Sequence, residues 1–167
     1  DPTLKSGGDN PDNMYYWGRI RGRHSYRLDI WLKPNVDLSV IVYAGGLNKD
    51  GGRRTVGELA LADLRVDAEG SATVWLGGEP REGNWLALAE DAGTLLIRET
   101  VADRRRANPS KFALSCLDGH PPPPLTPLEM AKSLRSVSGF VDYSIRYFSE
   151  MTAKWQQTPN RFFATDT

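Results

Sequence analysis

The segment GNWLALAEDAGTLLIR, residues 83–98, decides the fold class that this sequence predicts. Gly83-Asn84-Trp85-Leu86 comes first, and the turn Asp91-Ala92-Gly93 separates it from the apolar run Thr-Leu-Leu-Ile-Arg. Short apolar runs bounded by Gly, Asn and Asp are typical of β-strands joined by tight turns. We therefore expect strands over residues 85–88 and 94–101.

Earlier segments carry further strand patterns. Residues 26–32 alternate apolar side chains with Arg, Asp and Trp, which predicts a half-buried strand. Residues 38–43 (LSVIVY) form a continuous apolar run, which predicts a central strand covered on both faces. The turn at residues 68–71 contains glycine and predicts a tight hairpin. The other expected strands are residues 14–20, 59–64, 64–67, 72–76 and 111–117. For residues 59–64 a short helix is the alternative, because Glu, Leu and Ala favour helix. Many short strands joined by Gly-rich turns favour an antiparallel β-sandwich or jelly-roll-like fold.

The sequence changes character at the proline run 121–124, because proline has no N–H to donate to a sheet. Thr126-Pro127-Leu128-Glu129 then has the pattern of a capping box with proline at the first helical position. Apolar residues follow at three- and four-residue steps as far as Trp155, and Ser138-Gly139 could divide the segment into two helices. We therefore expect a mainly β chain with a C-terminal α-helical segment.

These patterns divide the chain into five parts. We expect residues 1–13 to form an N-terminal arm or turn, and residues 14–118 to form the β-sandwich domain. Residues 119–125 are a Pro-rich linker, and residues 126–157 are a helical segment that packs on the sandwich. Residues 158–167 are a C-terminal tail.

Composition limits the classes of function. Lys and Arg number 21, as do Asp and Glu, so no net charge favours binding to nucleic acid. No apolar run approaches the ~20 residues that span a bilayer, so no membrane span is expected. The single cysteine, Cys116, excludes an internal disulfide and a thiolate metal cluster. This is compatible with the cytoplasm, and secretion of a disulfide-free protein is the alternative.

Three motifs in order carry a resemblance: GDNPDNMY at residues 8–15, GNWL at 83–86 and LIR at 96–98. Through these motifs, residues 8–117 of the chain resemble the bacterial group called domain of unknown function 1214. The resemblance implies a β-sandwich or jelly-roll domain within longer proteins, in which a second β segment follows a helical insertion. It implies no settled activity. It therefore predicts self-association, or a further segment of a longer parent protein, to complete the sheet.

Three residues are candidates for binding a ligand. The amide of Asn84 offers directional hydrogen bonds, and the indole of Trp85 offers a flat face to a sugar or aromatic ring. A structural corner is the alternative for both. Arg98 could hold an anionic substrate with its guanidinium, or could form a salt bridge with Glu99 or Asp103.

A metal site is a weaker candidate near the N-terminus. Asp9, Asn10, Asp12 and Asn13 offer the oxygen ligands that Ca²⁺ prefers, but their spacing is not that of an EF-hand loop. Capping of turns by these side chains is the alternative and is favoured. No other cofactor is expected.

No catalytic set is recognisable, so enzymatic activity is left open. His24 lies in an expected turn and His120 before the prolines, and neither has a nucleophile and a carboxylate nearby in the sequence. Cys116 is expected to be a small core residue. The favoured interpretation is a structural or ligand-binding module of a larger bacterial protein or assembly. A hydrolase or lyase acting on a small or lipid-like substrate, and a carbohydrate-binding module using Trp85, are the alternatives.

Overall fold

The computed structural model divides the chain into two compact units, Asp1–Pro121 and Pro122–Thr167. It describes residues 10, 12–34, 36–46, 52–103, 105, 108–119 and 124–161. Within these residues, all the strands belong to the first unit, and the second unit contains one α-helix.

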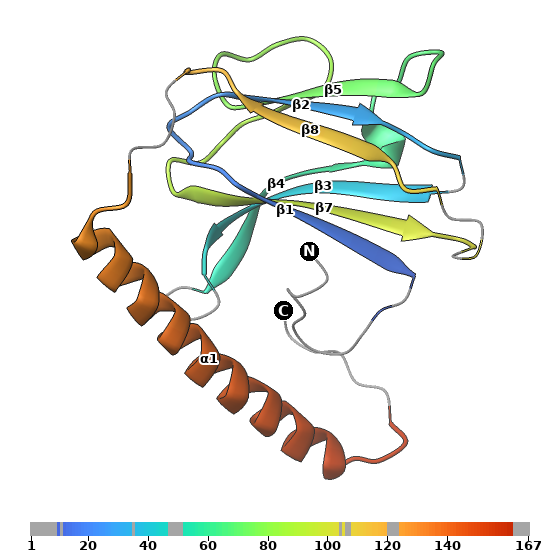
Figure 1. Cartoon of the computed structure of the whole chain (residues 1–167). Helices are drawn as coiled ribbons and strands as arrows, with labels where there is room; N and C mark the ends of the chain where they lie inside the picture. Colours follow the sequence, from blue (N-terminus) through green and yellow to red (C-terminus); the bar gives the residue numbers. More distant parts are fainter. Residues whose placement is uncertain are drawn as a thin grey trace. The chain divides into compact units, whose positions relative to one another are not determined.

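The strands of the first unit form two four-stranded sheets that face each other (Figure 1). The first sheet has the order β1-β7-β3-β4, made of β1 (Asn13–Arg19), β7 (Ala92–Val101), β3 (Val36–Gly45) and β4 (Arg53–Ala60). The second has the order β6-β5-β2-β8, made of β6 (Trp85–Leu86), β5 (Ser71–Leu76), β2 (Tyr26–Trp31) and β8 (Lys111–Cys116). All pairings are antiparallel except the parallel pairing of β5 with β6. The predicted β-sandwich with a C-terminal helix is confirmed, and the jelly-roll description stays a prediction.

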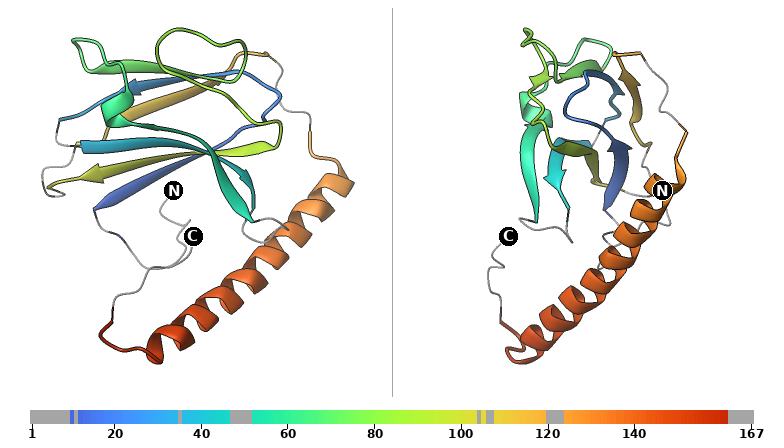
Figure 2. Two further views of the ribbon diagram at one scale, coloured as in Figure 1. Left: turned by 180° about the vertical axis from the view of Figure 1, so that it is seen from behind. Right: turned by 90° about the vertical axis from the view of Figure 1, so that its left-hand side faces the viewer.

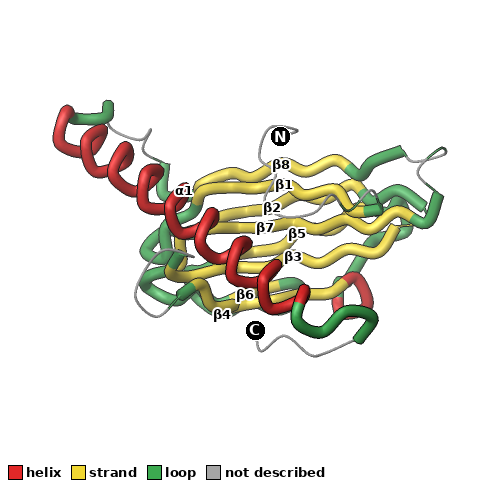
Figure 3. The backbone as a smooth tube through the Cα atoms, turned by 90° about the horizontal axis from the view of Figure 1, so that it is seen from below, coloured by secondary structure: helices red, strands yellow, loops and turns green. Residues whose placement is uncertain are grey.

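The two sheets stack with β8 beside β1 at one side and β6 beside β4 at the other (Figures 2 and 3). The rings of Tyr16 in β1 and Phe112 in β8 lie 4.7 Å apart between centroids. On the opposite side, Leu86 of β6 packs against the backbone at Gly57 of β4. Each side of the sandwich therefore ends in a pair of edge strands.

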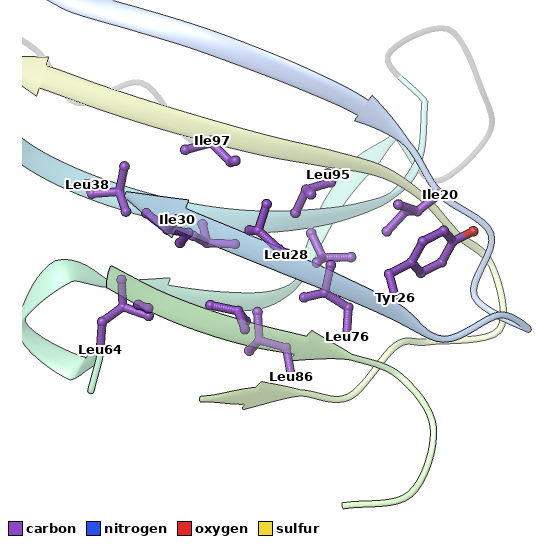
Figure 4. Close-up of a cluster of buried hydrophobic side chains, with 14 of the residues drawn as sticks. Ile20, Tyr26, Leu28, Ile30, Leu38, Leu64, Leu76, Leu86, Leu95 and Ile97 are labelled. Carbon is purple, nitrogen blue, oxygen red and sulfur yellow. The ribbon is translucent and has the colours of Figure 1, made fainter. Parts of the chain in front are cut away.

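The core lies between the sheets and follows from the alternation of side chains along the strands (Figure 4). In β2, Tyr26, Leu28 and Ile30 are buried, whereas Arg27 and Trp31 are exposed, so the predicted half-buried strand is confirmed. The largest fully buried apolar side chains are Leu28, Ile30, Leu38, Val40, Val42, Val74, Leu76 and Leu95. These residues come from both sheets, as a sandwich core requires.

Strand β3 is central, because it pairs with β7 on one side and β4 on the other. Val40 and Val42 belong to the core between the sheets. Ser39 and Ile41 alternate with them and are also buried. The prediction of a strand covered on both faces is therefore confirmed.

The expected strand over residues 59–64 is only partly correct. Strand β4 ends at Ala60, and Leu61–Asp63 form a turn of 3-10 helix closed by a hydrogen bond from Leu64 N to Leu61 O. This turn lies where the chain leaves the first sheet.

The expected strand over residues 64–67 is absent, although the turn after it is confirmed. Oδ1 of Asp67 accepts hydrogen bonds from the N–H groups of Glu69 at 3.0 Å and Ser71 at 2.7 Å. Gly70 has a φ of 80°, which the turn requires and glycine adopts without strain. Residues 64–67 form no strand because the backbone N–H and carbonyl of Arg65 bond to the side chain of Asn84 instead of to another strand.

The second unit contains the helix α1 (Pro127–Gln156). Thr126 and Glu129 form the predicted capping box, in which each side chain bonds the backbone N–H of the other residue. The helix is continuous through Ser138-Gly139, so it is not divided in two. Packing of this segment on the sandwich stays a prediction. Among the described residues, no helix combines the length and apolar character needed to cross a bilayer.

Candidate functional site

Asn84 is held by the backbone of the segment before β5. Its Oδ1 accepts from Arg65 N at 2.7 Å, and its Nδ2 donates to Arg65 O at 2.9 Å and to Thr73 O at 3.2 Å. The side chain is almost fully buried. The structural-corner interpretation accounts for all three bonds, and a ligand role for Asn84 stays a prediction.

Trp85 is half-buried in β6, opposite Trp75 of β5. Its Nε1 donates to the carbonyl oxygen of Gly77 at 3.1 Å. The indole N–H therefore anchors β6 to the end of β5.

Arg98 lies on the other sheet and points outward. Its neighbours in β7, Ile97 and Glu99, are buried on the inner side, whereas Arg98 is exposed. No salt bridge joins Arg98 to another residue of the described part of the chain. Because Asn84 and Trp85 belong to the second sheet, the three predicted ligand-binding residues do not form one site.

The segment around Asp12 shows turn contacts. Asn10 Oδ1 accepts from Asp12 N at 3.1 Å, and the carbonyl oxygen of Asp12 accepts from Val101 N at 2.8 Å. These are the contacts expected of a capped turn. Asp9 lies outside the described residues, and so does His120. Ca²⁺ binding stays a prediction.

A buried carboxylate, which sequence reasoning missed, ties the two sheets together. Glu99 is fully buried, and its two oxygens accept from Tyr16 Oη at 3.2 Å and from Ser110 N at 2.9 Å. Burial, reinforced by the nearby Glu99 carboxylate, raises the pKa of Tyr16 to about 12. Ser110 Oγ in turn accepts from Lys33 N at 3.1 Å. This chain of bonds fixes the backbone beneath the outer face of the second sheet.

That outer face carries two shallow hollows. The larger, of about 350 Å³, is lined by Trp31, Lys33 and Lys111. The smaller, of about 180 Å³, adjoins it across Trp31 and includes Asp29 and Thr73. Trp31 is 44% exposed and pairs in register with Lys111. An exposed indole therefore lies next to two cationic side chains.

The polar groups beside Trp31 are connected to one another. Asp29 Oδ1 accepts from Arg27 Nε at 2.9 Å and from Thr73 Oγ1 at 2.8 Å. The guanidinium of Arg27 also lies 5.8 Å from the ring centroid of Trp75, and that of Arg81 lies 4.3 Å from it. Cations on aromatic rings hold such side chains in place. The face therefore presents aromatic and charged groups in fixed positions.

A second cluster lies at the opposite end of β2 and β8. His24 Nδ1 lies 3.0 Å from Asp118 Oδ2, which also accepts from Ser25 N at 2.8 Å. One ligand atom each of His24, Asp118 and Cys116 lies within 4.8 Å of the other two. The Ser25 N–H is the main cause that lowers the pKa of Asp118; desolvation opposes it, and His24 adds to the lowering.

This cluster corrects two expectations. Cys116 is exposed and is not a core residue, because β8 is an edge strand whose side chains are exposed except that of Phe112. His24 has both a carboxylate and a thiol nearby, which the sequence spacing did not reveal. The register of β2 with β8 brings Cys116 opposite Tyr26, two residues from His24. No local motif marks that pairing, so the sequence carried no signal for it.

Comparison with known proteins shows a similar solved structure. No family model matches the chain, and no curated protein matches it. The crystal structure of an uncharacterized protein from Burkholderia cenocepacia is similar, with 32% sequence identity and a TM-score of 0.89. The match covers 99% of this chain and 46% of that chain. The fold is therefore shared, the chain spans less than half the length of that protein, and the match indicates no function.

Proposed function

We propose that the sandwich is a ligand-binding module of a larger protein or assembly, and that it binds on the outer face of the second sheet. The observation that carries this proposal is the pairing of an exposed indole, Trp31, with Lys111 and Lys33 around one hollow. Exposed tryptophan on a sheet is costly to solvate, and tryptophan is enriched where proteins bind partners.

The hollow is built on a fixed backbone. Trp31 and Lys111 occupy paired positions of β2 and β8, and the backbone of Lys33 is bonded to Ser110. Ser110 is bonded in turn to the buried Glu99. A face that is ordered before the ligand arrives loses less conformational entropy on binding.

The side chains define the chemistry of the ligand. The indole of Trp31 offers a flat surface for a sugar ring or an aromatic ring. Lys33 and Lys111 favour an acidic group on the same ligand. Acidic saccharides and aromatic carboxylates share this chemistry, and the carbohydrate-binding alternative is thereby moved from Trp85 to Trp31.

Titration with two probes tests this proposal. Oligogalacturonate represents the acidic saccharides and benzoate the aromatic carboxylates, with binding followed by calorimetry and by NMR shifts. We expect saturable binding of one probe, weakened at least about tenfold by Trp31→Ala and by Lys111→Ala. The matched control is Trp17→Ala, because Trp17 is 45% exposed on the first sheet. Absence of saturable binding, or equal losses in the control, would contradict the proposal.

The larger assembly is supported by two observations. Strand β8 pairs only with β2 among the described residues, so its other edge offers unpaired backbone groups. The similar Burkholderia protein is more than twice as long as the part that this chain matches. The proposed relationship to the group called domain of unknown function 1214 is supported by the order of the three motifs in this chain, at residues 8–15, 83–86 and 96–98.

Light scattering combined with intact-mass spectrometry tests the assembly. We expect particles that contain more than one copy of the chain, or a second polypeptide. A mass of one copy at all concentrations would contradict self-association.

A further inference from the structure

We propose that His24, Cys116 and Asp118 form a binding site for a divalent transition-metal ion of the Zn²⁺ class. One ligand atom from each residue lies within 4.8 Å of the other two, and His24 Nδ1 lies 3.0 Å from Asp118 Oδ2. Ligand atoms around a tetrahedral zinc ion, each about 2.0–2.3 Å from the metal, lie roughly 3.3–3.8 Å apart, which falls between these two values. Small movements of exposed side chains would therefore place all three on one ion.

The donor set selects the class of metal. Imidazole nitrogen, thiolate sulfur and carboxylate oxygen are the three kinds of ligand that zinc takes from proteins. Ca²⁺ and Mg²⁺ prefer sites made of oxygen only. Thiolate favours softer ions, so the cysteine is the residue that distinguishes this site from the acidic segment near Asp12.

Binding of the ion is balanced by loss of protons. The Cys116 thiol binds as thiolate and gives its proton to solvent. Asp118 binds as the carboxylate, whose charge the Ser25 N–H stabilises. His24 binds as neutral imidazole through Nδ1, with its proton on Nε2. Three protein ligands leave a fourth position for water, as in zinc sites that are not purely structural.

The backbone holds the three ligands in place. Cys116 lies opposite Tyr26 in the β2–β8 pairing, and Leu117 N donates to Ser25 O at 2.9 Å just beyond it. The N–H of Ser25, which would not touch the ion itself, donates to the carboxylate of Asp118 and orients it. The side chains of His24 and Asp118 are 30% and 39% exposed, so an ion can reach them from solvent.

This site is independent of the proposed ligand face. Trp31 pairs with Lys111 at one end of β2, whereas Tyr26 pairs with Cys116 at the other end. The two proposals therefore share no residue. Either can fail without affecting the other.

Titration of the full chain with Co²⁺ alone, in the presence of a phosphine reductant, tests the site. We expect one ion per chain and a thiolate-to-cobalt charge-transfer absorption in the near ultraviolet, both displaced by Zn²⁺. Zn²⁺ should also raise the midpoint of thermal unfolding, because it binds the folded state. Absence of saturable binding of one ion would overturn the proposal.

Variants assign the ligands. Cys116→Ser should abolish the charge-transfer absorption. Cys116→Ser and His24→Gln should each weaken Zn²⁺ binding at least about tenfold. Both positions are at least partly exposed, and far-ultraviolet circular dichroism checks that the variants fold. Ser115→Ala is the matched control, because Ser115 is exposed on the opposite face of β8 next to Cys116. Charge transfer that persists in Cys116→Ser, or equal weakening in Ser115→Ala, would overturn the assignment.

Discussion

The side chain of Asn84 pairs with the backbone of Arg65 as a neighbouring strand would, accepting from its N–H at 2.7 Å and donating to its carbonyl at 2.9 Å. One asparagine thereby replaces a strand partner for the segment between β4 and β5. This relationship explains why residues 64–67 stay fixed without joining a sheet. It also gives Asn84 a role in stability that can be measured.

Asn84→Asp should destabilise the sandwich. The substitution removes both N–H donors and places a carboxylate against the carbonyl oxygens of Arg65 and Thr73. We expect the free energy of unfolding to fall by about 2–3 kcal/mol, measured by urea denaturation. Asn108→Asp makes the same chemical change at an exposed position and should have little effect. Equal stability of the two variants would contradict the role given to Asn84.

Tyr16→Phe tests the bond between β1 and the buried Glu99. Loss of the hydroxyl leaves one carboxylate oxygen of Glu99 without its partner at 3.2 Å. We expect a loss of about 1–2 kcal/mol in the free energy of unfolding. Tyr15→Phe is the control, because Tyr15 is exposed on the opposite face of the same strand. A larger loss in the control would show that the buried bond contributes little.

The pKa of Tyr16 also predicts how stability changes at high pH. Its pKa is about 12 in the folded state, against the usual tyrosine value of about 10, so the folded state holds this proton more tightly. The stabilisation is fully present below pH 10 and is lost as the pH rises towards 12. Between these values Tyr16→Phe should lose less stability than the wild type. In Tyr16→Phe, tyrosinate absorbance should also show one fewer tyrosine that titrates near pH 12. Parallel pH profiles of the two proteins would be evidence against this assignment.

Gly22→Ala should disturb the connection between β1 and β2. A Cβ at this position would overlap the carbonyl oxygen of Ala89 and lie 2.6 Å from that of Glu90. Backbone must therefore move, at a cost of about 1–3 kcal/mol in the free energy of unfolding. At Gly93 the nearest atom to an added Cβ is 4.0 Å away, so Gly93→Ala is the control. Thermal and urea unfolding should separate the two variants, and equal midpoints would refute the packing argument.

Trp85→Ala should act on stability more than on ligand binding. The half-buried indole donates to Gly77 O and covers part of the sheet, and its loss should lower the free energy of unfolding by about 2 kcal/mol. Trp31→Ala should cost less stability, because Trp31 is 44% exposed and donates no hydrogen bond within the described part of the chain. Urea unfolding of both variants makes the comparison. Loss of oligogalacturonate affinity in Trp85→Ala with unchanged stability would return the ligand role to Trp85.

Local patterns predicted the elements that depend on local physics. The alternation in β2, the turn capped by Asp67 and the capping box at Thr126 all follow from neighbouring residues. The strand expected over 64–67 failed because its partner is the side chain of Asn84, distant in sequence.

The candidate sites were harder to predict for the same reason. The cluster of His24, Cys116 and Asp118 depends on the register of β2 with β8, which no local motif encodes. Trp85 and Arg98 are close in sequence, yet β6 belongs to the second sheet and β7 to the first, so the two residues lie on opposite outer surfaces. Proximity along a chain is a weak guide to a site in a sandwich, whose adjacent strands come from distant segments.

The strand order also has a consequence for synthesis on the ribosome. Strand β7 is the bridge between β1 and β3, and β8 is the last of the described strands to be made yet pairs with β2. A nascent chain that ends before β7 therefore holds β1 and β3 without the strand that joins them, and it exposes the apolar run of β3. Because long-range pairing is slow and exposed apolar runs promote aggregation, we expect a chain arrested before β7 to aggregate more readily than one that extends past β8.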